Sequence, residues 1–302
     1  MKHKSRTEYS IMNISVGLVG YIANTLMGFV CRMVFVRCLS AEYLGINGLF
    51  SNILSMLSLA ELGIGTAIVY ALYKPLAEDD HEKVASLMKF YGAAYRIIGC
   101  VVAIIGLCLL PFLDIIIRDT PDIKENIYII YVVYLFNTCL TYFFSYRGSL
   151  LVAAQRNYVQ TGWSYIITTL QSVIQIVVLL ATKEYFLYLG IQTVGTFIYN
   201  ILVSQWAKHD YPYITNKNIK PLPKNEKWSL IKNVKALTVN KLTDLLVNST
   251  DNIIITYFNG LVTVGAASNY TLLSGTLSTI TNQLFNGLTA SVGNLNAIEN
   301  EE

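Results

Sequence analysis

Charged side chains are scarce in this chain. Only 14% of its 302 residues are Asp, Glu, Lys or Arg, whereas 54% are hydrophobic and the mean hydropathy is +0.47. A soluble domain usually has about a quarter of its residues charged. The charges sit mainly in short segments, so the apolar runs between them are long. This pattern excludes an ordinary soluble protein and predicts an integral membrane protein.

Motifs for metal, disulfide or nucleotide chemistry are also lacking. The chain has three histidines, all in expected loops, and five cysteines that fall inside apolar runs without metal-ligand spacing. No GxxxxGK[ST] sequence occurs, so ATP-driven pumping by this chain alone is unsupported. We therefore expect no cofactor or metal site, and only H⁺ or Na⁺ as coupling ions. Nothing in the sequence indicates a nucleic-acid partner.

Eight apolar stretches are long enough to cross a bilayer, since each reaches the roughly 20 residues that a spanning helix needs. They are residues 11–36, 44–72, 86–112, 126–150, 159–182, 185–206, 232–258 and 264–292. The sequence thus predicts an all-α polytopic membrane protein with eight transmembrane helices.

Basic residues predict how these helices are oriented. With the N-terminus inside, fifteen Lys and Arg residues fall in inner segments, and four fall in outer loops: Arg37, Arg118, Lys124 and Lys183. Cytoplasmic loops carry the excess of basic residues. We therefore expect a multi-pass protein of the bacterial plasma (inner) membrane with a cytoplasmic N-terminus.

The longest loop divides the chain into two unequal parts. Residues 1–206 form an expected six-helix bundle, residues 207–228 a Lys- and Pro-rich cytoplasmic linker, and residues 229–302 the start of a second bundle. At an offset of 220 residues, Gly45 corresponds to Gly265 and polar Asn24 to Asp244. Six helices per repeat would give both copies one orientation, as in transporters with parallel repeats. The second bundle would then be incomplete, which suggests a C-terminally truncated chain.

Polar residues line one face of most expected spans, because residues three, four and seven apart share a helix face. Small polar residues also serve as packing contacts between helices. Ionisable residues within a membrane are functional candidates by default, and here they are Arg32, Glu61, Lys241, Asp244 and Asp251. Each has an alternative: Lys241 can pair with Asp244, and Arg32 and Asp251 can reach the outer surface. Glu61 has no basic residue within one helical turn, so its alternative role is to pair with a basic residue on another helix.

Tyrosines are abundant in residues 126–150 and recur at Tyr91 and Tyr95. Tyr is enriched at membrane–water interfaces. We therefore expect these rings to anchor helices at the interface. Stacking on a sugar is the alternative for Tyr91 and Tyr95 and, likewise, for Tyr70 and Tyr73 near the cytoplasmic mouth.

Several phrases resemble the bacterial polysaccharide flippases. They are Arg32 to Val36 (RMVFV), Glu42 to Ile46 (EYLGI), Leu59 to Gly65 (LAELGIG), Tyr73 to Ala77 (YKPLA), Asp251 to Ile255 (DNIII) and Ser268 to Tyr270 (SNY). The chain is similar along its whole length to Wzx-type lipid-linked oligosaccharide exporters of the multidrug/oligosaccharidyl-lipid/polysaccharide superfamily. It departs from their pattern by stopping after eight helices.

The resemblance implies a transporter, not an enzyme. It implies two six-helix bundles around a central cavity. An undecaprenyl-diphosphate-linked oligosaccharide, a precursor of capsule, O-antigen or a similar polymer, would cross from the inner to the outer leaflet by ion-coupled alternating access. The expected partners are this substrate, membrane lipids, and a polysaccharide polymerase with its assembly machinery.

Candidate site residues follow from that substrate. The diphosphate needs cations, for which Arg32 is the first candidate, Lys241 the second and Arg147 a third near the inner end. Amide side chains can bind sugar hydroxyls, and coupling ions need acids. The amide candidates are Asn24, Asn200 and Gln175, and the ion-coupling candidates are Glu61, Asp244 and Asp251.

Three other functions stay open. A drug/cation antiporter of the same superfamily would share the fold, although a cavity for cations should lack arginines. A membrane enzyme would need a large hydrophilic loop or a His/Asp/Glu cluster at one surface, and the sequence has neither. A nonfunctional fragment is the third alternative.

Overall fold

The computed structural model describes residues 6–57, 64–117, 122–216, 219–232 and 251–279, and every regular element in these ranges is a helix. The elements are α1 (Arg6–Cys38), α2 (Ala41–Leu57), α3 (Ile64–Ala77), α4 (His81–Cys108), η2 (Leu110–Phe112), α5 (Leu113–Ile116), α6 (Ile127–Tyr142), α7 (Tyr146–Ala153), α8 (Asn157–Thr182), α9 (Tyr185–Asp210), η3 (Pro212–Thr215) and α11 (Asp251–Asn259). Residues 224–232 and 261–279 are also helical. The expected all-α fold is thus confirmed for the described part of the chain.

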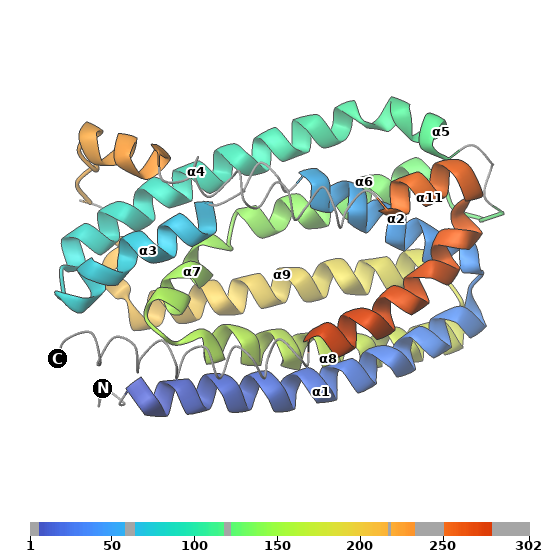
Figure 1. The fold of residues 1–302 in the computed structure, drawn as a ribbon, viewed down its shortest axis with the longest axis horizontal. Helices are drawn as coiled ribbons and strands as arrows, with labels where there is room; N and C mark the ends of the chain where they lie inside the picture. Colours follow the sequence, from blue (N-terminus) through green and yellow to red (C-terminus); the bar gives the residue numbers. More distant parts are fainter. Residues whose placement is uncertain (1–5, 58–63, 118–121, 217–218, 233–250, 280–302) are drawn as a thin grey trace.

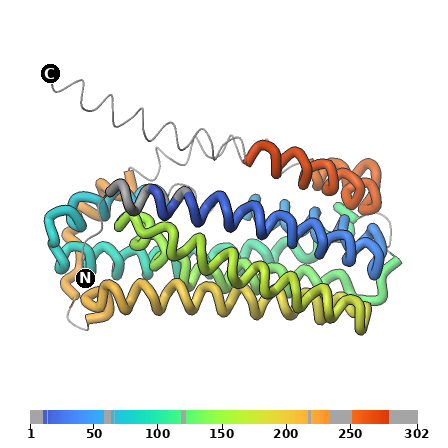
Figure 2. Tube along the Cα trace, turned by 90° about the horizontal axis from the view of Figure 1, so that it is seen from below, coloured from blue at the N-terminus to red at the C-terminus, as the bar shows by residue number. Residues whose placement is uncertain are grey.

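The long helices lie side by side along one axis (Figure 1). Helix α1 packs on α8, α8 on α9, and α9 on α6, which in turn packs on α4. Helix α11 and residues 261–279 lie over α2 and α1 at one face of this bundle (Figure 2). We call the end where α4 and α8 begin the inner end and the end where they finish the outer end, after the orientation expected from the sequence.

Side-chain caps and left-handed residues fix the helix ends. The Asp80 carboxylate accepts a hydrogen bond from the Lys83 backbone N–H at 2.9 Å and caps the start of α4. Asn126 caps α6 in the same way through the Tyr128 N–H at 2.9 Å. Such caps satisfy donors that a helix start leaves free. Lys183 ends α8 with a φ of 55°, so the turn into α9 is short.

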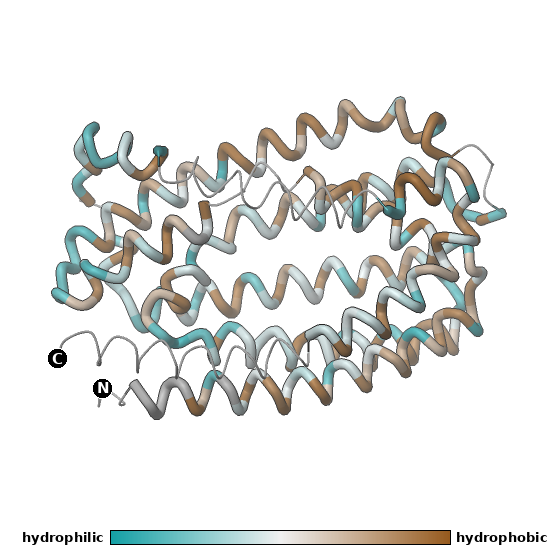
Figure 3. Tube along the Cα trace, viewed as in Figure 1, coloured by the Kyte–Doolittle hydropathy of each residue, from teal (hydrophilic) through white to brown (hydrophobic). Residues whose placement is uncertain are grey.

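Four described helices are long and apolar enough to span a membrane: Ile11–Cys38, His81–Ile116, Asn157–Thr182 and Tyr185–Asp210. The pair α6 and α7, bent by 46°, adds a fifth span if it is counted as one. Apolar residues remain exposed along these helices, for example Val19, Leu26 and Val177, and hydrophobic residues recur along the length of each long helix (Figure 3). The protein is therefore a multi-pass membrane protein.

The other expected spans include residues outside the described ranges. Residues 58–63 separate α2 from α3, residues 233–250 precede α11, and the last expected span continues beyond residue 279. The number of eight transmembrane helices stays a prediction.

The bend between α6 and α7 has a local cause. The Thr138 hydroxyl donates to the Tyr134 carbonyl at 3.0 Å, and the Thr141 hydroxyl donates to the Thr138 carbonyl at 2.7 Å. Hydroxyls that bond back to the preceding turn compete with the helix ladder and bend it. The expected single span at 126–150 is thus a broken helix.

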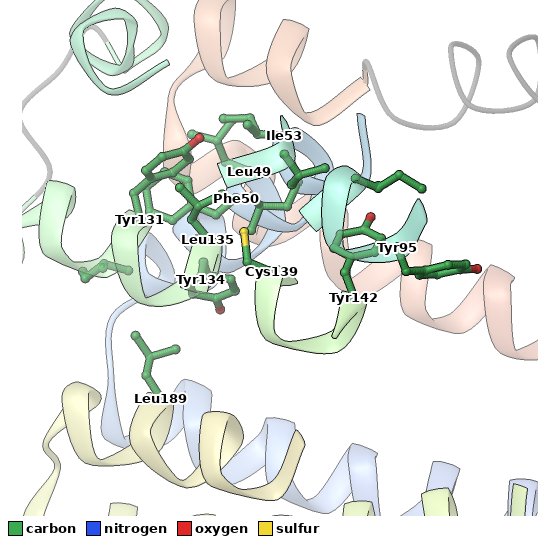
Figure 4. Packing of buried hydrophobic residues seen from close by; sticks show 14 of the residues in the cluster. Leu49, Phe50, Ile53, Tyr95, Tyr131, Tyr134, Leu135, Cys139, Tyr142 and Leu189 are labelled. Carbon is green, nitrogen blue, oxygen red and sulfur yellow. The ribbon is translucent and has the colours of Figure 1, made fainter. Parts of the chain in front are cut away.

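Tyrosines form much of the core. Tyr131, Tyr134 and Tyr142 on α6 are at most 8% exposed. Tyr131 and Tyr134 pack against Phe50 of α2, and Tyr142 lies beside Tyr95 of α4 (Figure 4). Tyr91 and Tyr95 on α4 are each 1% exposed. The interpretation of these rings as interface anchors was wrong, and burial also removes Tyr91 and Tyr95 as sugar-stacking surfaces in this state.

The segment after α9 is docked on the inner end of α4. The Tyr213 ring lies 4.3 Å from the His81 ring, and Leu222 is buried. Glu226 forms an ion pair with Lys83. Burial raises the pKa of Tyr213 to about 12. The expected linker therefore packs against the first bundle.

Two glycines allow α2 and residues 261–279 to touch through their backbones. A Cβ atom on Gly45 would lie 2.1 Å from the Leu261 carbonyl oxygen, and one on Gly265 would lie 2.5 Å from the Ala41 carbonyl oxygen. The two contacts are reciprocal at the offset of 220, since 41 + 220 = 261 and 45 + 220 = 265. The two helices therefore meet as equivalents around a local two-fold axis.

Because the contacts of Gly45 and Gly265 are reciprocal, substitution of either glycine should lower the free energy of unfolding by a similar amount. Gly45→Val and Gly265→Val should each destabilise the protein by about 1–3 kcal/mol or more, because the obstructing atoms are backbone and cannot move aside. Gly28→Val on α1 is the control, since nothing lies within 4 Å of its added Cβ. Thermal unfolding of the purified variants measures this. Loss at only one of the two glycines, or a loss no larger than that of the control, would contradict the close contact.

Candidate functional site

Arg32 lies where α1 meets residues 261–279. Its Nε donates to Asn269 Oδ1 at 2.7 Å, and its Nη2 donates to Ser268 Oγ at 2.5 Å. Both acceptors are neutral, and no ion pair among the described residues includes Arg32. Arg32 is half-buried. An arginine fork of this kind matches the oxygens of a phosphate.

The Arg32 contact has a counterpart across the local two-fold axis. Asn252 Nδ2 donates to the Gly48 carbonyl at 3.2 Å. At the offset of 220, Arg32 corresponds to Asn252 and Gly48 to Ser268, since 32 + 220 = 252 and 48 + 220 = 268. We call this group of contacts the seam. Arg32, Gly45 and Gly48 lie on one side of it, and Asn252, Gly265 and Ser268 lie on the other. The seam is symmetric in its backbone but carries a cation on one side only.

A buried polar network lies beside the outer part of the seam. Asn47 Oδ1 on α2 accepts hydrogen bonds from the hydroxyls of Tyr134, at 2.6 Å, and Tyr185. The Tyr43 hydroxyl donates to the Glu125 carboxylate. These bonds join α2, α6 and α9, so they hold α2 in place against the first bundle.

The amide candidates from the sequence already bond within the bundle. Gln175, 2% exposed, donates from Nε2 to the Tyr188 carbonyl at 3.1 Å. Asn200, 5% exposed, donates to the Thr196 carbonyl at 2.8 Å. Asn24 is half-buried on α1. Gln175 also accepts a hydrogen bond from the thiol of Cys31, the residue before Arg32, at 4.0 Å. The role of the three amides in sugar binding stays a prediction.

Of the three acidic ion-coupling candidates, Asp251 is the one that lies within the described residues. Asp251 is exposed at the first position of α11. Glu61, Asp244 and the cationic candidate Lys241 lie outside the described residues. Among the described residues, no group of three or more His, Cys, Asp or Glu side chains is placed to hold a metal ion.

Arg147 lies at the other end of the bundle, in a cavity that it shares with Lys89 and Arg96 of α4. Neither Lys89 nor Arg96 was among the predicted site residues. A signal was present, since Lys89 and Arg96 are seven residues apart and share a face of α4. Their proximity to Arg147, more than fifty residues later, comes from the packing of α4 on α7.

Comparison with known protein families shows the family of this chain. A family model described as polysaccharide biosynthesis protein matches residues 10–300. The chain belongs to this family. Members of this family are generally transporters rather than enzymes. Comparison with curated proteins and with solved structures gave no match.

The hydrogen bonds of Asn47 predict how two substitutions change the stability of this member of the polysaccharide biosynthesis family. Asn47→Ala should remove the acceptor that two buried tyrosine hydroxyls share and leave them only the hydrogen bond between Tyr134 and Tyr185, at a cost of about 1–3 kcal/mol. Tyr134→Phe removes one donor but leaves Asn47 bonded to Tyr185, so it should cost less. Unfolding of the purified variants in detergent compares the two. Equal losses for both substitutions would mean that Asn47 is not the shared acceptor.

Proposed function

We propose that the protein moves a lipid-linked oligosaccharide precursor of a cell-surface polysaccharide from the inner to the outer leaflet of the plasma membrane. Membership of the polysaccharide biosynthesis family over residues 10–300 supports the substrate class. The sequence resemblance to the Wzx-type exporters favours an undecaprenyl-diphosphate carrier, with capsule or O-antigen as examples of the polymer.

The observation that carries this proposal is Arg32. A charged group inside a membrane is costly and is kept for a function. Arg32 is bonded only to the neutral side chains of Ser268 and Asn269, so an anionic head group can take one or both of these places without breaking an ion pair. A diphosphate has the oxygen geometry that the guanidinium fork binds.

The seam also suggests how the head group is passed on. Arg32 belongs to the first bundle, whereas Ser268 and Asn269 belong to the expected second bundle, in residues 229–302. If the two bundles rock about the glycine contact, the Arg32 bonds open or close with them. Transporters with repeats commonly alternate access by such rocking. A proton or cation at Glu61, Asp244 or Asp251 would reset this movement, and Lys241 would supply a second cation.

A drug/cation antiporter is the main rival. An arginine without a carboxylate partner would repel a cationic substrate within the membrane, where charges are poorly screened. The position of Arg32 at the junction of the two bundles therefore favours the anionic, lipid-linked substrate. A polysaccharide polymerase acting on the product at the outer surface would be the downstream partner.

Substitution of Arg32 tests this function. Arg32→Ala should reduce polymer export in a complemented host by tenfold or more, because the loss of a charge-assisted bidentate contact of about 1.5–3 kcal/mol corresponds to a factor of about 10–100. Arg32→Lys should retain part of the export, since the charge remains but the fork is lost. Surface polysaccharide per cell, normalised to the amount of inserted protein, is the measurement.

Arg37→Ala is the matched control, because Arg37 lies on the same helix and is exposed. Export by this variant should equal that of the unchanged protein. Normal export by a stably inserted Arg32→Ala variant would rule out Arg32 as the head-group residue.

A further inference from the structure

A second cationic site lies at the inner end, far along the bundle from the seam. A cavity of about 220 Å³ opens between α4, α7 and the segment that follows α9. Lys89 and Arg96 enter it from α4 and Arg147 enters it from α7, while Tyr146 and Asn216 supply polar lining. One water occupies about 30 Å³ of liquid, so the cavity has room for a phosphate group together with several waters.

The three cations in this cavity bond only to neutral groups. Lys89 Nζ donates to the Ile219 carbonyl at 3.0 Å, Arg96 Nε to the Gly92 carbonyl at 3.0 Å, and Arg147 Nη1 to the Ser204 hydroxyl. Among the described residues that line the cavity there is no carboxylate. The ion pairs that the described residues form at this end use other cations, namely Lys74, Lys83, Arg156 and Lys220.

Three like charges around one small cavity repel one another. The charge of Lys208 on α9 also acts on Arg147. Lys74, Lys83, Arg156 and Lys220 at this end each have an acidic partner, whereas the three cations around the cavity have none among the described residues. An anion would relieve the repulsion, and two arginines with a lysine are the residues that bind phosphate best.

We propose that this cavity binds a phosphate group, carried either by an anionic lipid head group or by free inorganic phosphate. The position favours a head group, because the cavity opens near the inner end of α4 and α7, both of which belong to membrane-crossing segments. Basic pockets between helices on the cytoplasmic side are suited to anionic head groups. The site is separate from Arg32 and does not depend on the proposed export function.

A bound phosphate would also hold the segment between the two bundles. Ile214, Asn216 and Ile219 form one wall of the cavity, and the same segment is tied to α4 by the ion pairs of Lys83 with Glu226 and of Lys220 with Glu82, the latter at 2.6 Å. The Glu82 carboxylate raises the pKa of Lys220. The phosphate would thus bridge α4, α7 and this segment, and so stabilise its docked position.

Binding to the purified full chain tests the site. The probes are short-chain phosphatidylglycerol, short-chain phosphatidylcholine and inorganic phosphate, each titrated calorimetrically in a neutral detergent. We expect phosphatidylglycerol to bind and phosphatidylcholine, which has no net charge, to bind at least tenfold more weakly. Binding of inorganic phosphate with an affinity equal to that of phosphatidylglycerol would identify free phosphate as the source. Binding of none of the three would overturn the proposal.

Variants locate the binding. Lys89→Gln combined with Arg96→Gln should weaken phosphatidylglycerol binding at least tenfold, and this pair is the safer variant because both side chains bond only to backbone carbonyls. Arg147→Gln should have a similar effect, although it also removes a contact to Ser204. Lys74→Gln is the matched control, because it removes an exposed cation from the same end. Undiminished binding by the Lys89/Arg96 variant would overturn the site.

The two proposals can fail separately. Loss of phosphatidylglycerol binding in the Lys89/Arg96 variant, together with normal export by Arg32→Ala, would establish the cavity and reject the head-group role of Arg32. Undiminished phosphatidylglycerol binding by the Lys89/Arg96 variant, together with loss of export by Arg32→Ala, would reject the cavity alone.

Discussion

The close backbone contact between α2 and residues 261–279 is the constraint on which the rest of the structure depends. Gly45 and Gly265 each lie under a carbonyl of the other helix, so neither position has room for a side chain. This approach brings α1 near the second helix of the pair and places Arg32 beside Ser268 and Asn269. Without hydrophobic driving force in lipid, small residues and interhelical hydrogen bonds are the means by which membrane helices associate, and the seam uses both.

The seam is symmetric in geometry and asymmetric in chemistry. Arg32 and Asn252 occupy equivalent positions, and each reaches across to the other half of the pair. The first gives the contact a positive charge and the second does not. Together with the cavity of Lys89, Arg96 and Arg147 at the inner end, this gives the described part of the chain two separate places where cations have only neutral partners. Both fit a substrate or lipid that carries phosphate, which agrees with membership of a polysaccharide biosynthesis family.

Sequence reasoning succeeded where one segment carries the signal by itself. Long apolar runs predicted α1, α4, α8 and α9, because a spanning helix must satisfy its own backbone. It failed where the answer depends on several segments. Tyr131 and Tyr134 follow the composition of interface anchors but are buried by α2, and Lys89 meets Arg147 only through helix packing. The repeat could be predicted only in part. Identity at the offset of 220 is weak, and the reciprocal contacts of Gly45 and Gly265 are visible only in the folded structure.

The most direct test of the central claim is transbilayer movement in vesicles that contain only the purified protein and lipid. A fluorescent diphosphate-linked oligosaccharide lipid would be placed in one leaflet, and its appearance in the other would be followed with a membrane-impermeant quencher, alongside a phosphatidylcholine analogue. The account predicts that the protein accelerates movement of the diphosphate lipid but not of the analogue. Equal rates for both lipids, or no acceleration over protein-free vesicles, would contradict it.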